Sequence, residues 1–399
     1  MMKSSKLFSY YLVFVIFGYV AVAPVSHFLY QAEQTSIFAI LYRVFVVALS
    51  IIFVYLNFSV RKKVKLNLYQ KTSLSLLIIF CFLVYLRLAY DFAFQELINV
   101  EGFAEKIIFF GIALILLPCL SLISDDYDIE TFFKYSGLFL FFSILISLLI
   151  SFNQLSNSNI TNIRFGYDRL NPITLGTSAS SLILISIALN SKKYFTEKII
   201  FAFFSVGFFG LVLSGSRGAI LSFLVCVFVY LIFTADIKKI IIFSILTVVV
   251  LFLSLYLFSL ISSEYNYIER LLSTGSESDQ SANIRFNMYR GALEQFTSNP
   301  MFGDFILERG YMFYPHNQTL EVMMSTGVFG LTVYLLYHVL IIFSSVSYIK
   351  TKFNIFYFVV FLLYIQALVG AQFSGSFLFS SNVWFFSLIL VFSYKRTDY

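Results

Sequence analysis

Long apolar stretches alternate with short polar segments along almost the whole chain. Most of these stretches approach the ~20 apolar residues with which a helix crosses a bilayer, and few charges interrupt them. The pattern predicts an all-α, polytopic integral membrane protein with about twelve transmembrane helices. The predicted spans are residues 7–26, 37–58, 73–90, 107–124, 132–152, 172–190, 199–214, 218–234, 240–261, 325–349, 354–371 and 377–394.

Two span boundaries depend on small residues rather than on charges. Residues 353–394 contain no charged side chain and are too long for one helix, so we place a break at Gly370–Ser376. The seventh and eighth spans are separated only by the residues from Ser214 to Gly218. Glycine and serine clusters of this kind favour turns.

The one long polar segment, residues 262–324, lies between the ninth and tenth spans. Its start, residues 273–280, is rich in serine and acidic residues and is typical of flexible chain. Residues 284–296 then have helical spacing, and Asn299-Pro300 ends that helix. One stripe of the predicted helix carries Ile284, Met288, Ala292 and Phe296.

Composition supports a membrane protein without a separate soluble part. The 399 residues are 59% hydrophobic and 12% charged, whereas a soluble domain carries about 25% charged residues. We therefore expect one membrane domain, residues 1–399, with the 262–324 loop inserted in it. We expect membrane lipid as a partner and no nucleic acid.

Lysine and arginine fall on opposite sides of the predicted membrane. If the N-terminus is cytoplasmic and the spans alternate, every lysine except Lys106 lies on the cytoplasmic side, and the C-terminus does too. Every arginine except Arg61 and Arg396 then lies on or near the outer face. The lysines follow the positive-inside rule, whereas the arginines oppose it and need another explanation.

Arginine is suited to bidentate recognition of phosphate and carboxylate groups. The outer face is therefore predicted to bind an anion such as a phosphorylated lipid. A polar loop at residues 153–171 adds Arg164 and Arg169 to this face. The plainer explanation for any single arginine is that its side chain reaches towards lipid headgroups.

The first motif, Ser214–Leu221, places Ser216 and Arg217 at the outer start of a span. Backbone N–H groups at the start of a helix favour anions, and the small neighbours of Arg217 allow a ligand to approach closely. By itself the motif is equally typical of a tight turn with an interfacial arginine.

The second motif is the predicted helix in the long loop, with Arg285 and Tyr289 near its apolar stripe. Arg290 and Glu294 are spaced as an i, i+4 ion pair. By itself this helix is typical of a solvated surface.

The third motif runs from Tyr314 to Glu321, where the long loop enters the tenth span. His316 follows a proline and could act as a general base. Asn317 could orient a substrate hydroxyl or cap the helix, and Glu321 is an ionisable group at the entry to a membrane. Gly327 and Gly330 are expected to allow close helix packing. The plainer reading is a capped helix start with an interfacial histidine.

These three motifs, in this order, resemble the O-antigen polymerase and ligase family of bacterial envelope polysaccharide assembly. The resemblance rests on Ser216-Arg217-Gly218 before a span and on an arginine-led helix at Arg285 in a large periplasmic loop. It rests also on His316-Asn317 followed at fixed spacing by Gly327 and Gly330. It covers about residues 160–350 in pattern; the rest is similar only in being multi-span.

The resemblance implies a metal-independent, cofactor-free and inverting glycosyl transfer at the periplasmic face of the bacterial inner membrane. The donor would be a glycan on undecaprenyl pyrophosphate, with Arg217 and Arg285 on the pyrophosphate and His316 assisting the acceptor hydroxyl. We further assign substrate binding to Ser216, Tyr289, Arg290, Tyr314, Asn317, Glu321, Arg164 and Arg169.

The polymerase and the ligase share this signature, and a flippase is an alternative of another class with a similar span count. The polymerase adds the growing glycan to another lipid-linked repeat unit, and the form of the Ser214–Gly218 and Tyr314–Glu321 motifs is more similar to polymerases. The alternatives are the ligase, which transfers the glycan to lipid A core, and a lipid-linked oligosaccharide flippase. A chain-length regulator protein is a further expected partner of a polymerase.

Overall fold

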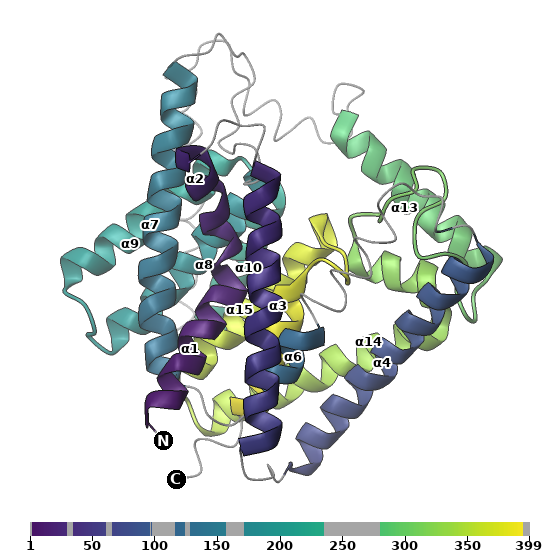
Figure 1. Cartoon of the computed structure of the whole chain (residues 1–399), viewed down its shortest axis with the longest axis horizontal. Helices are drawn as coiled ribbons and strands as arrows, with labels where there is room; N and C mark the ends of the chain where they lie inside the picture. Colours follow the sequence, from purple (N-terminus) through teal and green to yellow (C-terminus); the bar gives the residue numbers. More distant parts are fainter. Residues whose placement is uncertain are drawn as a thin grey trace. The chain divides into compact units, whose positions relative to one another are not determined.

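The computed structural model describes residues 2–29, 35–60, 66–95, 97, 116–123, 128–156, 171–234 and 280–393. Within these ranges the regular elements are helices, and the β-structure is one isolated bridge between Glu308 and Phe313. The predicted all-helical fold is therefore confirmed (Figure 1). The helices are α1 (Met2–Phe17), α2 (Tyr19–Leu29), α3 (Thr35–Val60), α4 (Leu68–Phe94), α6 (Leu117–Leu122), α7 (Ile129–Ser156), α8 (Pro172–Ser191), α9 (Glu197–Ser214), α10 (Arg217–Thr234), α13 (Gln280–Ser298), α14 (Gln318–Thr351), α15 (Ile355–Ser374) and α16 (Ser381–Ser393).

The predicted count of twelve spans is confirmed only in part, because some of these spans lie outside the described residues. Among the described residues, eight helices are long and apolar enough to cross a membrane, and the bent pair α1–α2, with an angle of 64°, would make a ninth. The helix α16 has only 13 residues and is too short by this measure. The predicted span 240–261 lies outside the described residues, as does most of span 107–124. The chain is a multi-pass membrane protein, and its described residues contain eight or nine candidate spans.

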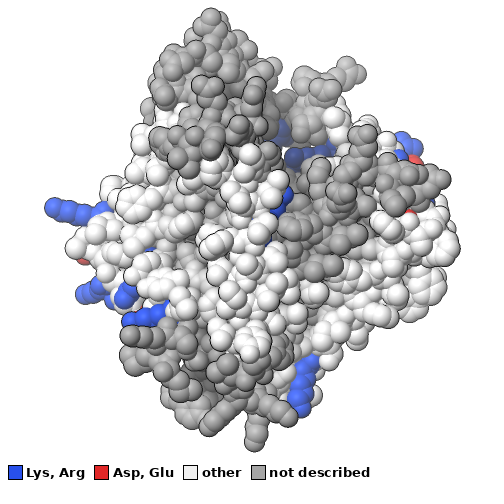
Figure 2. All heavy atoms as spheres, viewed as in Figure 1, with Lys and Arg blue, Asp and Glu red and all other residues white. Residues whose placement is uncertain are grey.

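The described surface agrees with this assignment. Figure 2 shows a face on which most described atoms belong to uncharged residues, with lysine and arginine confined to separate patches. Side chains such as Phe45, Phe201 and Phe343 are large, apolar and exposed on candidate spans. Exposed apolar side chains over such lengths fit a surface that contacts lipid.

The chain divides into two compact units. The first consists of Met1–Ile16, Leu41–Ile129 and Ile284–Tyr399, and the second of Phe17–Ile40 and Glu130–Asn283. In the first unit α14 packs against α4, and α15 packs against α16. Its core is aromatic: the ring of Trp384 lies 5.5 Å from that of Phe80 and 5.7 Å from that of His338. His338 is thus a packed core residue.

The second unit is built around α8, which packs against α9 and α10. Small residues allow this packing, since a Cβ on Gly207 of α9 would lie 2.9 Å from the Ala179 carbonyl oxygen of α8. The α9 helix ends at Gly215, whose φ of 58° is left-handed, and α10 begins at Arg217. The predicted break between the seventh and eighth spans is confirmed.

The α14 helix is interrupted by Gly327, whose φ of 63° is not helical. At this point the turn after α13 lies against the helix backbone. The Val328 N–H donates to the Pro300 carbonyl over 2.8 Å, and the Asp304 N–H donates to the Met324 carbonyl over 2.9 Å. A Cβ on Gly327 would overlap the Met301 carbonyl group. We predicted that Gly327 would let two helices approach; instead it admits the backbone of a turn.

Gly330 also differs from the expectation of close helix–helix contact. A Cβ there would overlap the Thr326 side chain one turn earlier in α14 itself. The Thr326 hydroxyl in turn donates to the Val322 carbonyl over 2.7 Å. Gly330 thus leaves room for a side chain that satisfies a backbone carbonyl just before the interruption at Gly327.

Candidate active site at the start of helix α14

His316 lies in the short segment between the Glu308–Phe313 bridge and α14. Its φ of 57° is in the left-handed region, which is unusual for a residue with a side chain and costs about 1–3 kcal/mol. The Tyr314 ring packs edge-on against the imidazole at 4.6 Å and stacks on Phe313 at 4.4 Å. Strained residues that the surrounding packing holds in place cluster at functional sites.

Burial sets the charge of His316. Desolvation lowers the pKa of the imidazole to about 4, and the positive charge of Arg285 acts in the same direction. The ring is therefore neutral near pH 7 and has a lone pair that can accept a proton. Its Nδ1 atom is buried and has no hydrogen-bond partner among the described residues.

Arg285 of α13 belongs to the same cluster. Its Nη1 donates to the Phe373 carbonyl over 2.9 Å and to the Ser374 hydroxyl over 3.3 Å, at the end of α15. Its charge lowers the pKa values of His316 and Tyr314, although burial raises that of Tyr314 to about 12 overall. Within the described part of the chain, Nε and Nη2 of Arg285 have no hydrogen-bond partner. One nitrogen of the guanidinium is thus fixed by the end of α15, and the other two can donate hydrogen bonds to a ligand.

Asn317 is the N-cap of α14. Its Oδ1 accepts from the Leu320 N–H over 2.9 Å, and its Nδ2 donates to the Gln372 carbonyl over 3.0 Å. The Gln372 side chain also accepts from the Thr319 hydroxyl over 2.7 Å. Of the two roles foreseen for Asn317, the structure displays the cap, which fixes the residue that follows His316.

Glu321 lies beneath this cluster and is buried. Its carboxylate accepts from the Ser376 hydroxyl over 2.7 Å and from the Phe377 N–H over 2.8 Å. These two residues belong to the connection between α15 and α16. The position of Glu321 is that of a group that holds this connection against α14, with both oxygens occupied inside the protein.

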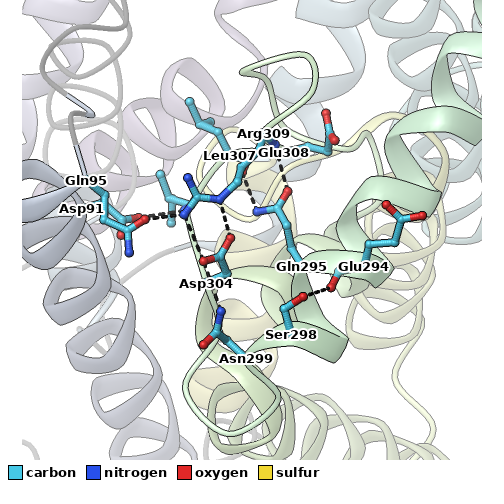
Figure 3. Close-up of polar contacts among 12 residues, drawn as sticks. Asp91, Gln95, Glu294, Gln295, Ser298, Asn299, Asp304, Leu307, Glu308 and Arg309 are labelled. Carbon is cyan, nitrogen blue, oxygen red and sulfur yellow. Dashed lines mark hydrogen bonds and ion pairs between the residues drawn. The ribbon is translucent and has the colours of Figure 1, made fainter.

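Two of the arginines that were predicted to lie on the outer face make structural contacts around the turn after α13. Figure 3 shows those of Arg309. Arg309 forms a fork with Asp304, with N–O distances of 2.6 and 3.0 Å, and so lowers the pKa of that carboxyl. Gln295 of α13 joins the same network by bonding the Arg309 N–H and the Leu307 carbonyl. Arg309 therefore stabilises the loop through Asp304 and links it to α13 through Gln295.

Arg87 does the same from α4. It pairs with Asp91 one turn later and donates to the Gly303 carbonyl over 3.3 Å. Asp91 in turn accepts from the Ile306 N–H over 2.8 Å. Topology alone grouped Arg87 and Arg309 with the anion-binding arginines, whereas their guanidinium groups are used to hold the loop.

The remaining predicted residues of α13 divide into two faces. Arg290 and Glu294 form the predicted ion pair at 3.0 Å, and the Arg290 side chain is 83% exposed. Tyr289 lies towards the cluster: burial raises its pKa and Arg285 opposes that shift. The predicted apolar stripe is wrong at its N-terminal end. Met288 and Ala292 are buried, whereas Ile284 is exposed.

Arg217 and Ser216 lie in the second unit, at the start of α10. The Ser216 carbonyl accepts from the Ile220 N–H over 3.0 Å, and its buried hydroxyl accepts from the Ala219 N–H over 3.4 Å. Ser216 therefore caps α10, and Arg217 is the first residue of that helix. Arg285 and His316 share the first unit, whereas Arg217 does not. Arg164 and Arg169 lie outside the described residues.

The end of α15 was missed at the level of sequence. Gln372, Phe373 and Ser374 supply the partners of both Asn317 and Arg285. Gln318, next to Asn317, is buried, and both polar atoms of its amide have no partner among the described residues. The one available signal was the polar interruption at Gly370–Ser376, which we interpreted only as a break between spans.

Comparison with known families gives one match. Residues 200–304 match the Wzy_C model, described as O-Antigen ligase. The matched region includes Arg217 and Arg285 and ends before His316. A comparison with curated proteins found no match.

Proposed function

We propose that this chain is an O-antigen polymerase, and the match of residues 200–304 to the model described as O-Antigen ligase supports this. It transfers the growing glycan from undecaprenyl pyrophosphate to an acceptor lipid-linked repeat unit. The observation that carries the proposal is the pairing of neutral His316 with a partly unoccupied Arg285 guanidinium at the entry to α14. We place the reaction at the periplasmic face of the inner membrane, with both termini cytoplasmic.

The reaction follows from the two side chains. The acceptor hydroxyl oxygen attacks the anomeric carbon, the bond from that carbon to the pyrophosphate oxygen breaks, and the hydroxyl proton passes to His316. The carrier leaves as lipid pyrophosphate, and the anomeric configuration inverts. Such a base contributes about 10²–10⁴-fold in rate. Arg285 stabilises the charge that develops on the leaving group, and the role of Arg217 on the pyrophosphate stays a prediction.

Binding of the donor would itself change the pKa of His316. Before the donor binds, burial lowers the pKa of His316 to about 4, and the charge of Arg285 adds a smaller shift in the same direction. A bound pyrophosphate would neutralise that charge and raise the pKa of the imidazole towards neutrality, where a base is most effective. Donor binding and base strength are thereby coupled through Arg285.

This coupling predicts the pH dependence of the reaction. Protonation removes the base, so activity should fall as the pH drops through the pKa of His316. For kcat/KM, which reports the free enzyme, the acidic limb should have its midpoint near pH 4. For kcat the midpoint should lie at higher pH. Transfer rates of the purified protein in vesicles at saturating and limiting donor test this. An acidic limb of kcat/KM near 6.5, the ordinary pKa of histidine, would contradict the burial argument.

The family description itself favours one second function, the ligase that transfers the glycan to lipid A core. Deletion of the gene distinguishes the two on a lipopolysaccharide gel. A polymerase mutant should make core that bears a single repeat unit. Core without any repeat, together with accumulated lipid-linked polymer, would show that the protein is the ligase and not the polymerase. Accumulation of cytoplasm-facing lipid-linked units would instead indicate a flippase and overturn both.

A further inference from the structure

The turn after α13 exposes two large apolar side chains. Met301 is 52% exposed and Phe302 is 72% exposed, and neither lies in a candidate span. In water such a pair would be unfavourable, since burying a side chain of this size is worth a substantial free energy. The turn therefore needs an apolar environment that the first unit does not provide.

The backbone of this turn is fixed to a membrane-spanning helix. Its carbonyl at Pro300 and its N–H at Asp304 bond to α14 on the two sides of Gly327. A Cβ on Gly303 would overlap the Ser325 carbonyl, so the two backbones lie in direct contact. The turn is thus held at the level of residues 324–328, where the apolar stretch of α14 begins.

The exposed side chains continue the lipid-facing stripe of α14. The Phe302 ring stacks on the Phe329 ring, with centroids 5.3 Å apart and 23° between the planes. Phe329, Leu336 and Phe343 follow at intervals of seven residues, so they share one helix face, and all three are exposed. Phe302 extends this stripe beyond the helix.

The other side of the turn is polar. Asp304 pairs with Arg309, and the Gly303 carbonyl accepts from Arg87 at the end of α4. Apolar side chains therefore project beside Phe329, while ionised groups follow within two residues. This order of groups matches the boundary between acyl chains and headgroups.

We propose that residues 299–304 form a membrane wedge, in which Met301 and Phe302 insert among the acyl chains of the leaflet next to the start of α14. The wedge fixes α13, and with it Arg285, at the depth of the lipid phosphates. The inference rests on the candidate span α14 and not on the proposed function, so it holds whichever reaction the site performs.

Tryptophan fluorescence in brominated lipid vesicles tests the wedge. The chain has one tryptophan, the buried Trp384, so the unsubstituted protein supplies the background. Phe302→Trp is compared with Leu336→Trp, in the middle of the lipid-facing stripe, and with Glu294→Trp, on the charged face of α13. Met301→Trp serves if Phe302→Trp does not fold.

The emission that Phe302→Trp adds to this background should fall at least twofold in lipid brominated near the ester end of the acyl chain, and less in lipid brominated near the methyl end. Leu336→Trp should show the reverse order, and Glu294→Trp no quenching. Quenching of the Phe302 and Met301 variants no greater than that of Glu294→Trp would overturn the wedge. Blue-shifted emission without quenching would also overturn it, since a second copy of the chain or another protein would then cover the turn.

Discussion

Replacing His316 with alanine is expected to stop chain elongation, with a loss in transfer rate of about 10²–10⁴-fold. The neutral, half-buried imidazole is the base of the proposed mechanism, and alanine leaves no group to accept the hydroxyl proton. Cells that carry only this variant should make core with a single repeat unit on a lipopolysaccharide gel. Protein levels in the membrane should match those of the unsubstituted chain.

His316→Asn is the matched control for the backbone at this position. Asparagine tolerates the left-handed conformation better than most residues, and the residue has a φ of 57°, but its amide cannot act as a base. Both variants should therefore be folded and inactive. Long chains from His316→Asn would show that only the conformation of residue 316 matters, and the catalytic assignment would be lost.

Gly327→Ala is expected to destabilise the first unit by about 2–5 kcal/mol, because left-handed strain and overpacking combine. Residue 327 has a φ of 63°, and the new methyl group would overlap the Met301 carbonyl. The turn after α13 would have to leave α14, which breaks the bonds of Pro300 and Asp304 to that helix. Thermal unfolding of the purified protein in detergent measures the loss.

Gly370→Ala provides the comparison for Gly327→Ala. Gly370 lies inside α15, and a Cβ there would meet no atom within 4 Å. Alanine in a helix interior is favoured over glycine by roughly 0.5–1 kcal/mol, so this variant should be at least as stable as the original. Equal melting temperatures for the two variants would show that the close contact between α14 and the turn after α13 does not stabilise the protein.

Sequence reasoning succeeded where a signal is local. Span boundaries follow from apolar length, which is why α8, α9 and α10 coincide closely with predicted spans. Glycine and serine marked the end of α9, and i, i+4 spacing gave the Arg290–Glu294 pair. The sequence also singled out His316, because a titratable residue at a membrane boundary is unusual in itself, and its role stays a prediction.

The failures concern contacts between distant parts of the chain. Arginine count and side of the membrane cannot separate Arg285 from Arg309, because the difference lies in Asp304 beside Arg309 and in the end of α15 beside Arg285. Glu321 looked like a substrate ligand until its partners at Ser376 and Phe377 were located. Gly327 likewise gave no hint that a turn, rather than a helix, lies against it.

The most direct test of the proposed site compares Arg285 with Arg290, two arginines of the same helix. Transfer from an undecaprenyl-pyrophosphate-linked repeat unit is measured with purified protein in vesicles, as a function of donor concentration. Arg285→Ala should reduce kcat/KM for the donor by about 10²-fold or more, since it removes a charge-assisted contact to the leaving pyrophosphate. Although the sequence placed Arg290 on the substrate, its side chain is exposed and paired with Glu294. We therefore expect Arg290→Ala, which breaks only an exposed ion pair, to change kcat/KM by less than about twofold. Equal rates for both variants, or a loss confined to Arg290→Ala, would contradict the assignment of the Arg285–His316 cluster as the site of glycan transfer.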